Sequence, residues 1–311
     1  MTLQNILDAT RAESQQREHQ YPLTVLQRKV EKMGPTRGFA RALGKKPFSV
    51  IAEIKRASPS MGNIAGDAID RALGIYTDHQ IVSAISVITQ KAHFGGATDD
   101  LENVRKLTQH NPKPILRKDF IFSPYEIFFS RWIGADAILL MANVVENKDE
   151  FKKFHDLAVS IGLDVLCEVH DEPEIGILPH SVKICGINSR RFKGIAQKPT
   201  FGKTIMKSLI GTAGFGADTQ TDLTAFDLLE KLEERLPTGC LKIAESGISS
   251  QNIGGILKKH RFNAALIGTS LLKNSRPEMI KALDKIQDEA DGALLETALG
   301  TPAKRQTPVA V

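Results

Sequence analysis

Acidic, basic and amide side chains end several otherwise apolar segments of the sequence. Glu53 and Lys55 close one segment, Lys118 and Asn188 close two others, and Glu168 lies near the end of a fourth. Lysines and glutamates that share a cavity form an acid–base site, in which one group donates a proton and another accepts it. A structural ion pair would explain any single one of these residues. Their recurrence at the ends of several segments instead favours a shared polar cavity.

Glycine and hydroxyl residues end two later segments. Ser246 and Gly247 follow Glu245, and Gly268 precedes Thr269. Glycine lets backbone N–H groups approach an anion closely, and the N-terminus of a following helix adds positive potential. Each motif by itself also fits an ordinary turn. Together, in the last two units of the chain, they favour a phosphate-binding site.

Eight short β-prone segments that alternate with amphipathic segments would position these residues. Near-continuous Val, Ile, Leu and Ala is typical of strands that are covered on both faces. The predicted strands are 49–55, 84–89, 114–118, 136–141, 164–169, 183–188, 241–245 and 264–268. The predicted helices are 67–80, 97–109, 124–134, 147–161, 172–178, 221–235, 249–260 and 276–289. Eight such units predict a single (β/α)₈ TIM barrel, whose active site lies at the C-terminal ends of the strands.

The pattern also suggests domain boundaries. We expect an N-terminal helical extension over 1–45, the barrel over 46–290 and a fraying tail over 291–311. A doubly wound sheet is the alternative fold, but it more often carries a glycine-rich dinucleotide fingerprint after its first strand, which this chain lacks. The glycine-rich segment 194–220 is longer than an ordinary connection, and we expect a functional or flexible loop there.

Composition narrows the class of protein. Apolar residues make up 41% and charged residues 25% of the chain, as in soluble globular proteins. The polar N-terminus resembles no secretory signal, so we expect a cytosolic location and no membrane contact. Cys167, Cys185 and Cys240 are too few for a disulfide framework and lack zinc-ligand spacing; we expect them to be buried. The net charge of +5 is spread out, which suits an anionic small substrate and argues against nucleic acid.

At these residues the sequence resembles the indole-3-glycerol-phosphate synthase family. The likeness is most specific in Val50-Ile-Ala-Glu-Ile-Lys-Arg-Ala-Ser-Pro-Ser-Met-Gly62, Leu116-Arg-Lys-Asp-Phe120 and Asp164-Val-Leu-Cys-Glu-Val-His-Asp171. Looser similarity covers 84–96, 134–140, 186–190, 244–248 and 266–268. In total the resemblance extends from the N-terminal helices to about residue 273.

The resemblance implies a reaction of tryptophan biosynthesis. The family closes the aniline ring of 1-(2-carboxyphenylamino)-1-deoxyribulose 5-phosphate onto the sugar ketone. It then releases CO₂ and water to give indole-3-glycerol phosphate, so the chain would be a carboxy-lyase that uses no cofactor and no metal. The implied partner is the anionic sugar-phosphate substrate. The sequence leaves the oligomeric state open, with a monomer as one option.

The resemblance also implies roles for individual residues. Lys118 would be the general acid of ring closure, Glu168 the base, and Lys55 a contact for the substrate anion and a second acid. Glu53 and Asn188 would orient these groups. The implied substrate-binding positions are Ser58, Pro59, Phe94, Phe120, Leu140, Arg190 and Glu245. Those for the phosphate are Ser246, Gly247, Gly268 and Thr269. For the aromatic residues, core packing is an equal alternative.

Three departures from the family pattern concern the substrate pocket. The loop 194–220 is long, Gln90 stands where a glutamate is common, and Phe94-Gly-Gly-Ala97 is a looser form of the usual motif. None of them removes a proposed catalytic group. A phosphoribosylanthranilate isomerase is the alternative enzyme, but its reaction needs a Cys/Asp pair. A non-catalytic relative that binds a sugar phosphate or a partner is the other alternative, against which the intact lysines and glutamates speak.

Overall fold

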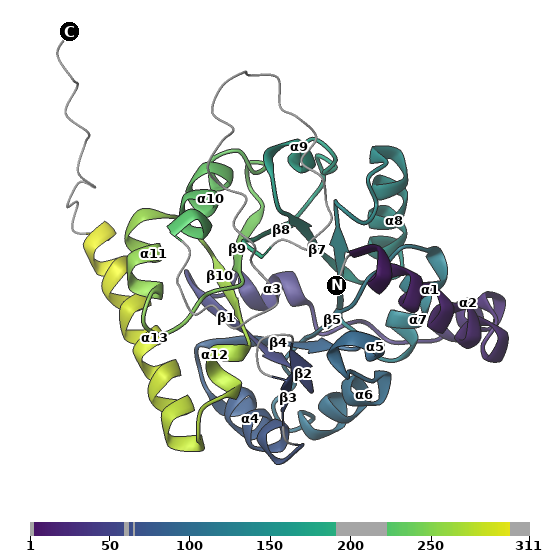
Figure 1. Ribbon diagram of the computed structural model, residues 1–311, viewed down its shortest axis with the longest axis horizontal. Coiled ribbons are helices and arrows are strands. Elements are labelled where there is room, and N and C mark those ends of the chain that lie inside the picture. The colour runs from purple at the N-terminus through teal and green to yellow at the C-terminus, as the bar shows by residue number, and fades with distance from the viewer. Residues whose placement is uncertain (1–2, 59–61, 65, 191–222, 299–311) are drawn as a thin grey trace, which may run out of the picture.

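Eight parallel strands close into a barrel (Figure 1). The structure is a computed structural model that describes residues 3–58, 62–64, 66–190 and 223–298. Around the barrel the strands follow the order β1-β10-β9-β8-β7-β6-β5-β4, and β4 pairs with β1 to close it. Their bounds are β1 Ser49–Ile54, β4 Val82–Ile88, β5 Ile115–Lys118, β6 Ala137–Met141, β7 Asp164–Val169, β8 Ile184–Asn188, β9 Leu241–Glu245 and β10 Ala264–Ile267. The predicted TIM barrel and all eight predicted strands are confirmed.

Helices alternate with the strands and surround the barrel (Figure 1). They are α4 Gly66–Asp78, α6 Thr98–Leu107, α7 Pro124–Trp132, α8 Lys148–Ser160, α10 Leu223–Glu233, α11 Ile253–Lys259 and α13 Arg276–Ala298. Single turns form α5 Lys91–Phe94, α9 Glu172–Ile175 and α12 Thr269–Leu272, and a hairpin pairs β2 Ala57–Ser58 with β3 Gly62–Asn63. Within the described ranges, no helix combines the length and apolar character needed to cross a membrane.

Several helices differ from their predicted bounds, among them α11, which begins at Ile253 where residue 249 was expected. The helix predicted over 172–178 stops after one turn at Ile175. Helix α13 instead continues beyond the predicted end at 289 to Ala298, into the segment that was expected to fray. Leu283, Ile286 and Ala290 form one buried apolar stripe along this helix, which packs on α11. Residues 299–311 lie outside the described part of the chain.

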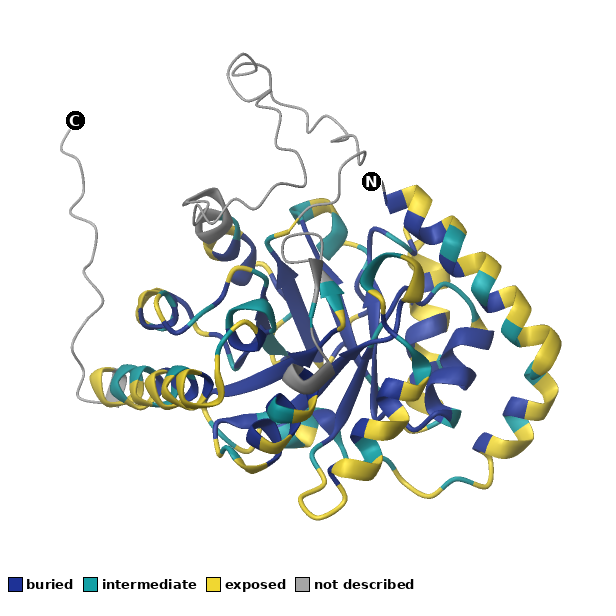
Figure 2. Ribbon diagram, turned by 60° about the horizontal axis from the view of Figure 1, so that its bottom comes forward, coloured by how far each residue is buried: buried dark blue, intermediate teal, exposed yellow. Residues whose placement is uncertain are grey.

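Two apolar cores lie on the two faces of the barrel. Side chains alternate along each strand, so Ile51, Leu116 and Leu166 fill the interior while their neighbours pack against the helices. Both layers are buried, as Figure 2 shows for the strands at the centre of the molecule. The three cysteines are free and buried, as predicted, and Cys167 and Cys185 belong to the outer core.

The N-terminal helices of the extension are present as predicted: α1 Leu3–Gln20, α2 Leu23–Val30 and α3 Phe39–Leu43. Helix α2 packs against α7 on the outside of the barrel. Phe39 and Leu43 of α3 are fully buried among the interior side chains. They share this cluster with Ile51 of β1 and Ala84 of β4, which lie near the starts of their strands. This short helix therefore closes the N-terminal end of the barrel, opposite the end where the strands deliver their last residues.

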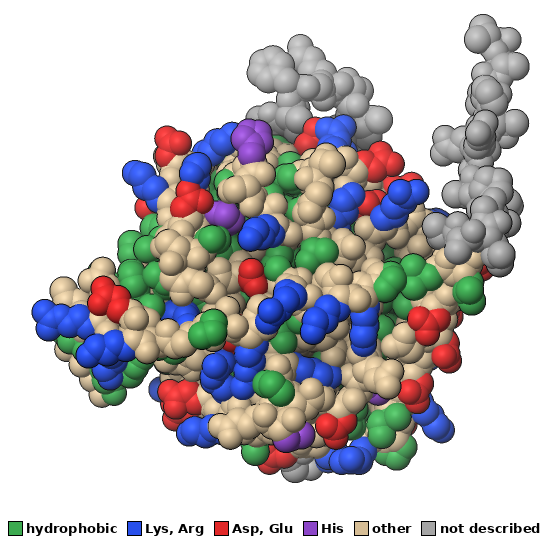
Figure 3. Space-filling view, turned by 180° about the vertical axis from the view of Figure 1, so that it is seen from behind, with side chains coloured by type: hydrophobic (Ala, Val, Ile, Leu, Met, Phe, Trp, Pro, Cys, Tyr) green, Lys and Arg blue, Asp and Glu red, His purple; other side chains and the backbone are tan. Residues whose placement is uncertain are grey.

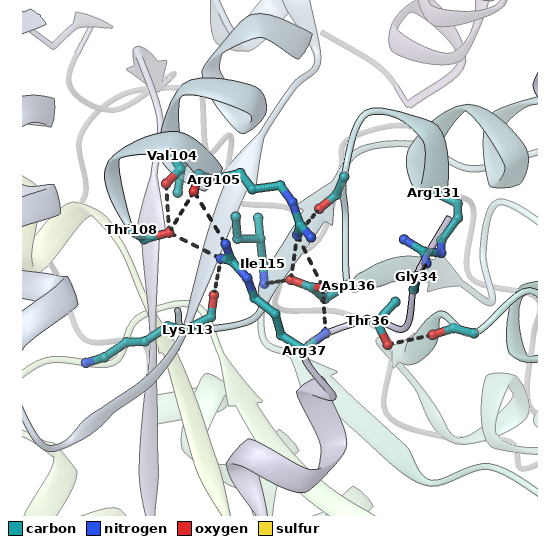
Figure 4. Close-up of polar contacts among 12 residues, drawn as sticks. Gly34, Thr36, Arg37, Val104, Arg105, Thr108, Lys113, Ile115, Arg131 and Asp136 are labelled. Carbon is teal, nitrogen blue, oxygen red and sulfur yellow. Dashed lines mark hydrogen bonds and ion pairs between the residues drawn. The ribbon is translucent and has the colours of Figure 1, made fainter. Parts of the chain in front are cut away.

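Hydrogen bonds fasten the extension to the barrel (Figure 4). The backbone N–H of Arg37 donates to the carboxylate of Asp136 at 2.8 Å, and its guanidinium donates to Thr108 Oγ1 at 3.2 Å and to the Lys113 carbonyl at 2.8 Å. Asp136 is buried and also accepts the backbone N–H of Ile115 at 2.9 Å. One carboxylate thus joins the extension to the starts of two strands.

Candidate active site

The predicted acid–base residues meet at the C-terminal end of the barrel. Glu53, Lys118, Glu168, Asn188 and Glu245 come from five different strands, and each lies on the inner side of its strand. Residues two positions apart on a strand point to the same face, and the residue two positions earlier is in each example an interior apolar one. Leu116 precedes Lys118 in this way, and Leu166 precedes Glu168. The carboxyl ends of parallel strands share one edge, so the strand ends that the sequence predicted do converge on a single site.

Glu53 and Lys55 form a buried ion pair. Lys55 Nζ lies 2.8 Å from Glu53 Oε1, and each residue is only 5% exposed. Burial disfavours the charge of Glu53, but the ammonium groups of Lys55 and Lys118 outweigh it and hold the pKa of Glu53 below its ordinary value. Glu53 is therefore ionised, and the pair predicted from the spacing of two is confirmed.

Lys118 lies between two carboxyl groups. Its Nζ is 3.5 Å from Glu168 Oε2 and 3.8 Å from Glu245 Oε2. Burial opposes the ammonium charge, yet the nearby carboxyl groups of Glu168, Glu245 and Glu53 raise the pKa of Lys118 above its ordinary value. Lys118 is thus protonated, and its ammonium group lies at the barrel mouth between the two carboxyl groups.

Glu168 and Glu245 interact directly and divide the charge unequally. Burial and the negative charge of Glu168 raise the pKa of Glu245 well above its usual range. For Glu168 burial acts in the same direction, but Lys118 and His170 overcome it and hold the pKa of Glu168 well below its usual range. Two neighbouring buried carboxyl groups cannot both ionise cheaply, so the surrounding charges favour the proton on Glu245 and the negative charge on Glu168.

His170 is a residue of this site that the sequence reasoning missed. Its Nε2 lies 3.2 Å from Glu168 Oε1, and its Nδ1 lies 3.3 Å from Glu174 Oε2. The signal was present in the sequence, because His170 follows Glu168 by two residues and Glu174 follows His170 by four. The spacing of two that identified Glu53 with Lys55 applies equally to Glu168 with His170.

Two glycines make room for the carboxyl groups. A Cβ on Gly186 would lie 2.0 Å from Glu245 Oε1, and a Cβ on Gly268 would lie 2.3 Å from Glu53 Oε1. Any side chain at either position would therefore push a glutamate out of the site. For Gly268 this is a reason different from the expected approach of a phosphate, and Gly186 was not recognised from the sequence.

An outward turn follows β9. Ser246 and Gly247 both adopt left-handed backbone conformations, with φ of 67° and 69°. A non-glycine residue in this region is strained, and such strain gathers at ligand-binding turns. Ser246 Oγ donates to Asn188 Oδ1 at 2.7 Å, which ties the turn to β8. After the neighbouring strand β10, Thr269 begins α12 directly after Gly268. The predicted phosphate-binding residues thus lie on two adjacent turns at the mouth of the barrel.

The remaining predicted substrate contacts divide into three groups. Phe120 and Phe94 pack with the interior cluster, and Arg190 is exposed beyond β8, where its backbone N–H donates to Asn188 Oδ1 at 3.0 Å. Leu140 is not brought to the site, because it lies on the outer face of β6 within the core that faces the helices. Finally, Ser58 lies in the hairpin strand β2, and Pro59, like the loop 194–220, lies outside the described residues.

A second hollow lies at the opposite end of the barrel. It is a cavity of about 320 Å³ beside α3 and the starts of β4 and β5. Five cations line it: Arg37, Arg41, Lys45, Lys46 and Lys113. Figure 3 views the molecule from behind Figure 1 and shows Lys and Arg side chains gathered near the centre of the view. Asp78 is the one carboxylate in this lining, so the hollow lacks the paired glutamates that acid–base chemistry requires.

A closed (β/α)₈ barrel whose strand ends carry buried lysines and glutamates beside two turns suited to an anion defines a barrel enzyme of acid–base chemistry. Among the described residues, no group of His, Cys, Asp and Glu is arranged to hold a metal ion. The family model "Indole-3-glycerol phosphate synthase" matches residues 3–201. This chain belongs to the indole-3-glycerol phosphate synthase family.

Curated relatives agree with this assignment, and a solved structure shares the fold. An indole-3-glycerol phosphate synthase from Lachnospira eligens is 36% identical over 251 residues, which cover 80% of this chain and 83% of the relative. One from Thermoanaerobacter pseudethanolicus is 32% identical and covers 93% of this chain and 96% of its own length. A 3-hexulose-6-phosphate synthase structure from Salmonella typhimurium has a TM-score of 0.54 at 12% identity, over 79% of this chain and 99% of that one, which shows a shared fold alone.

Proposed function

We propose that this chain converts 1-(2-carboxyphenylamino)-1-deoxyribulose 5-phosphate into indole-3-glycerol phosphate, CO₂ and water. Within a barrel of this family, one observation carries the proposal: Lys118 Nζ lies 3.5 Å from Glu168 and 3.8 Å from Glu245. A charged acid, an ionised base and a protonated carboxyl group thereby face one mouth. A cytosolic location, expected from the polar N-terminus, is part of the same proposal.

Ring closure needs a proton donor at the ketone oxygen. The ring carbon that carries the carboxylate attacks the ketone carbon, and the π electrons of the C=O bond move to the oxygen. Lys118 donates a proton to this oxygen, which becomes a hydroxyl group. The carbon–carboxylate bond then breaks, CO₂ leaves, and the bonding pair returns to the ring. Lys118 suits this step because its ammonium group also stabilises the negative charge that develops on the oxygen.

Dehydration needs an acid and a base together. The new hydroxyl leaves as water after receiving a proton, and a base removes a proton from the adjacent carbon so that the indole double bond forms. Glu168 is the ionised carboxylate of the site and serves as this base. Lys55 is the candidate for the second acid, since Glu53 holds it in place at 2.8 Å.

Substrate recognition follows from the surrounding turns. The phosphate would bind the backbone N–H groups of the turns at Ser246, Gly247, Gly268 and Thr269. The anthranilate ring would pack on Phe94, Phe120 and Pro59. Glu53 and Asn188 would orient the lysines and the sugar hydroxyls, with Ser58 and Arg190 at the rim.

The cysteines argue against the isomerase alternative. A Cys/Asp acid–base pair would require a reactive thiol at the barrel mouth. Cys167 and Cys185 instead lie in the outer core, and burial contributes to a raised pKa for both thiols. Neither thiol has the depressed pKa of a catalytic cysteine. The hydrogen bond with Cys185 lowers the pKa of Cys240, but this residue precedes β9 at the end of the barrel opposite the mouth.

Turnover of the carboxyphenylamino substrate by the purified protein tests the proposal. Appearance of indole-3-glycerol phosphate, together with its loss in Lys118→Met, is the expected result. A folded wild-type protein that binds the substrate without converting it would support the non-catalytic alternative. Conversion of phosphoribosylanthranilate instead would support the isomerase.

A further inference from the structure

Behind the base Glu168, a buried histidine connects two carboxylates. Glu168 is 0% exposed and His170 is 3% exposed, and both side chains project from the end of β7 toward the interior. The imidazole Nε2 lies 3.2 Å from Glu168 Oε1, while Nδ1 lies 3.3 Å from Glu174 Oε2 on α9. The amide of Asn143, which follows β6, lies 3.1 Å from the same Nδ1. Glu174, His170 and Glu168 thus form a continuous line that ends at the site.

We propose that His170, held by Glu174, is a positioning residue that fixes the carboxylate of Glu168 for proton abstraction. This inference rests on the proposed function, in which Glu168 is the base. A carboxylate that must remove a proton from one particular carbon requires a fixed orientation, because small displacements of a reacting group cost large factors in rate. Lys118 contacts Oε2 of Glu168 and His170 contacts Oε1, so the two cations hold the carboxylate from both oxygens.

The charges around the imidazole favour its charged form. Glu168 faces it from β7, Glu174 from α9 and Glu245 from β9, while Lys118 approaches Glu168 from β5. Burial disfavours the imidazolium, but the hydrogen bonds and charges of Glu168 and Glu174 outweigh it and raise the pKa of His170 to about 10. With His170 charged and Glu245 protonated, the cations Lys55, Lys118 and His170 balance the three remaining carboxylates of this cluster.

Glu174 has a second contact that fixes the geometry. Its Oε2 accepts the backbone N–H of His170 at 2.6 Å, and Asp171 caps the single turn of α9 from which Glu174 projects. The carboxylate is therefore folded back onto the end of β7. A neutral Gln at position 174 would keep an acceptor for this backbone N–H while removing the charge that favours the imidazolium.

The test compares steady-state kinetics of His170→Asn, His170→Gln and Glu174→Gln over a range of pH. We expect His170→Asn to lower kcat by about 10²-fold with little change in KM, since the phosphate and ring contacts lie elsewhere. His170→Gln, whose amide reaches as far as the imidazole Nε2, should restore part of the loss. In both His170 variants the acid limb of the kcat/KM profile should move to higher pH, because loss of the neighbouring cation raises the pKa of Glu168. Glu174→Gln keeps the imidazole, so its effect should appear as a loss of kcat smaller than that of His170→Asn.

A matched control separates this role from burial of a histidine. His155 lies on α8, in the outer layer of helices. It is 4% exposed, and its Nδ1 lies 3.0 Å from Asp156 Oδ1. His155→Asn should leave the pH profile and kcat unchanged. If His170→Asn lowers only the midpoint of unfolding, and its folded fraction keeps the wild-type kcat and acid limb, His170 is structural and the proposal is overturned.

An NMR titration keeps the inference separate from the proposed function. The imidazole signals of His170 should remain those of the charged form at pH 8 and should shift in Glu168→Gln. Absence of wild-type turnover would refute the proposed function and, with it, the role of His170 in proton abstraction. The titration would then still report whether His170 contacts Glu168. Imidazole chemical shifts of His170 that are the same in the wild type and in Glu168→Gln would overturn that contact as well.

Discussion

Lys118 and its neighbour Arg117 carry the same charge but lie on opposite faces of β5. Lys118 points into the barrel toward Glu168, whereas Arg117 is fully buried between β5 and α7. There the guanidinium lies 2.8 Å from Asp119 and 2.8 Å from Glu126. The alternation of side chains along a strand explains the difference.

The two cations should therefore fail in different ways when each is replaced by Met. Lys118→Met removes the proton donor, so turnover should fall by about 10²–10⁴-fold while the fold is kept. Arg117→Met leaves Asp119 buried without its cation and Glu126 with Arg17 alone, so the free energy of unfolding should fall by about 3–5 kcal/mol. Its folded fraction should retain most of the turnover. Steady-state kinetics and urea denaturation of both variants measure this, and an inactive but stable Arg117→Met would contradict it.

Strain at Ser246 gives a second test at a single residue. With φ of 67°, a residue that has a Cβ costs about 1–2 kcal/mol here, whereas glycine costs little. Both Ser246→Ala and Ser246→Gly remove the hydrogen bond to Asn188. The glycine variant should nevertheless be more stable than the alanine variant by about 1 kcal/mol, the reverse of the usual order. Chemical denaturation of the pair decides, and a more stable alanine variant would refute the strain.

At the scale of elements, the barrel strands must leave space as well as supply groups. Gly186 in β8 leaves room for Glu245 of β9, with which it shares the interior of the barrel. The nearest atom to an added Cβ belongs to the end of a flexible side chain, so the fold can tolerate the clash by moving Glu245. The glycine in this strand therefore serves the side chain of a neighbouring strand.

Gly186→Ala should accordingly lower turnover, by about 10²-fold if Glu245 moves by about 1 Å, with only a small change in stability. Gly74→Ala is the matched control, because a Cβ at this exposed position of α4 would meet nothing within 4 Å. The control should gain about 0.5–1 kcal/mol of stability and keep its kinetics. Equal kinetics in the two variants would show that Glu245 does not need the space.

For the whole molecule, the two ends of the barrel have separate tasks. The C-terminal end holds the acid–base cluster, beside which α1 packs on α5, and the N-terminal end holds the contacts that attach Arg37 and α3. Asp136 is central to the latter, because it accepts the backbone N–H groups of Arg37 at 2.8 Å and Ile115 at 2.9 Å. In barrels of this kind, residues at the N-terminal end serve stability.

Asp136→Ala should thus lower stability without altering catalysis. It leaves buried donors unsatisfied, each at a cost of about 1–3 kcal/mol. The midpoint of thermal unfolding should fall clearly, while kcat and KM of the folded enzyme at low temperature stay at wild-type values. Altered kinetic constants with an unchanged unfolding midpoint would show instead that the two ends are coupled.

The sequence by itself determined the barrel and the residues of its mouth. Apolar runs mark strands covered on both faces, and eight of them in alternation with amphipathic helices admit few other folds. Alternation along a strand places Lys118 inside and Arg117 outside once one interior residue is known. Local rules of this kind need no knowledge of the neighbouring strands. They fail for Leu140, because β6 is apolar on both faces and its parity cannot be read from residue types.

Only the tertiary structure decided how groups from different strands act on one another. Glu245 keeps a proton because Glu168 adjoins it, and Glu168 is ionised because Lys118 and His170 hold it. Gly186 and Gly268 are required by glutamates that lie far from them along the chain. The charge states depend on separations of 3.2–3.8 Å between side chains that the barrel brings together, and the glycines on the space that those side chains occupy. The charge state of a group and the space beside it depend on distances between atoms of different strands, and the order of residues along one strand does not give those distances.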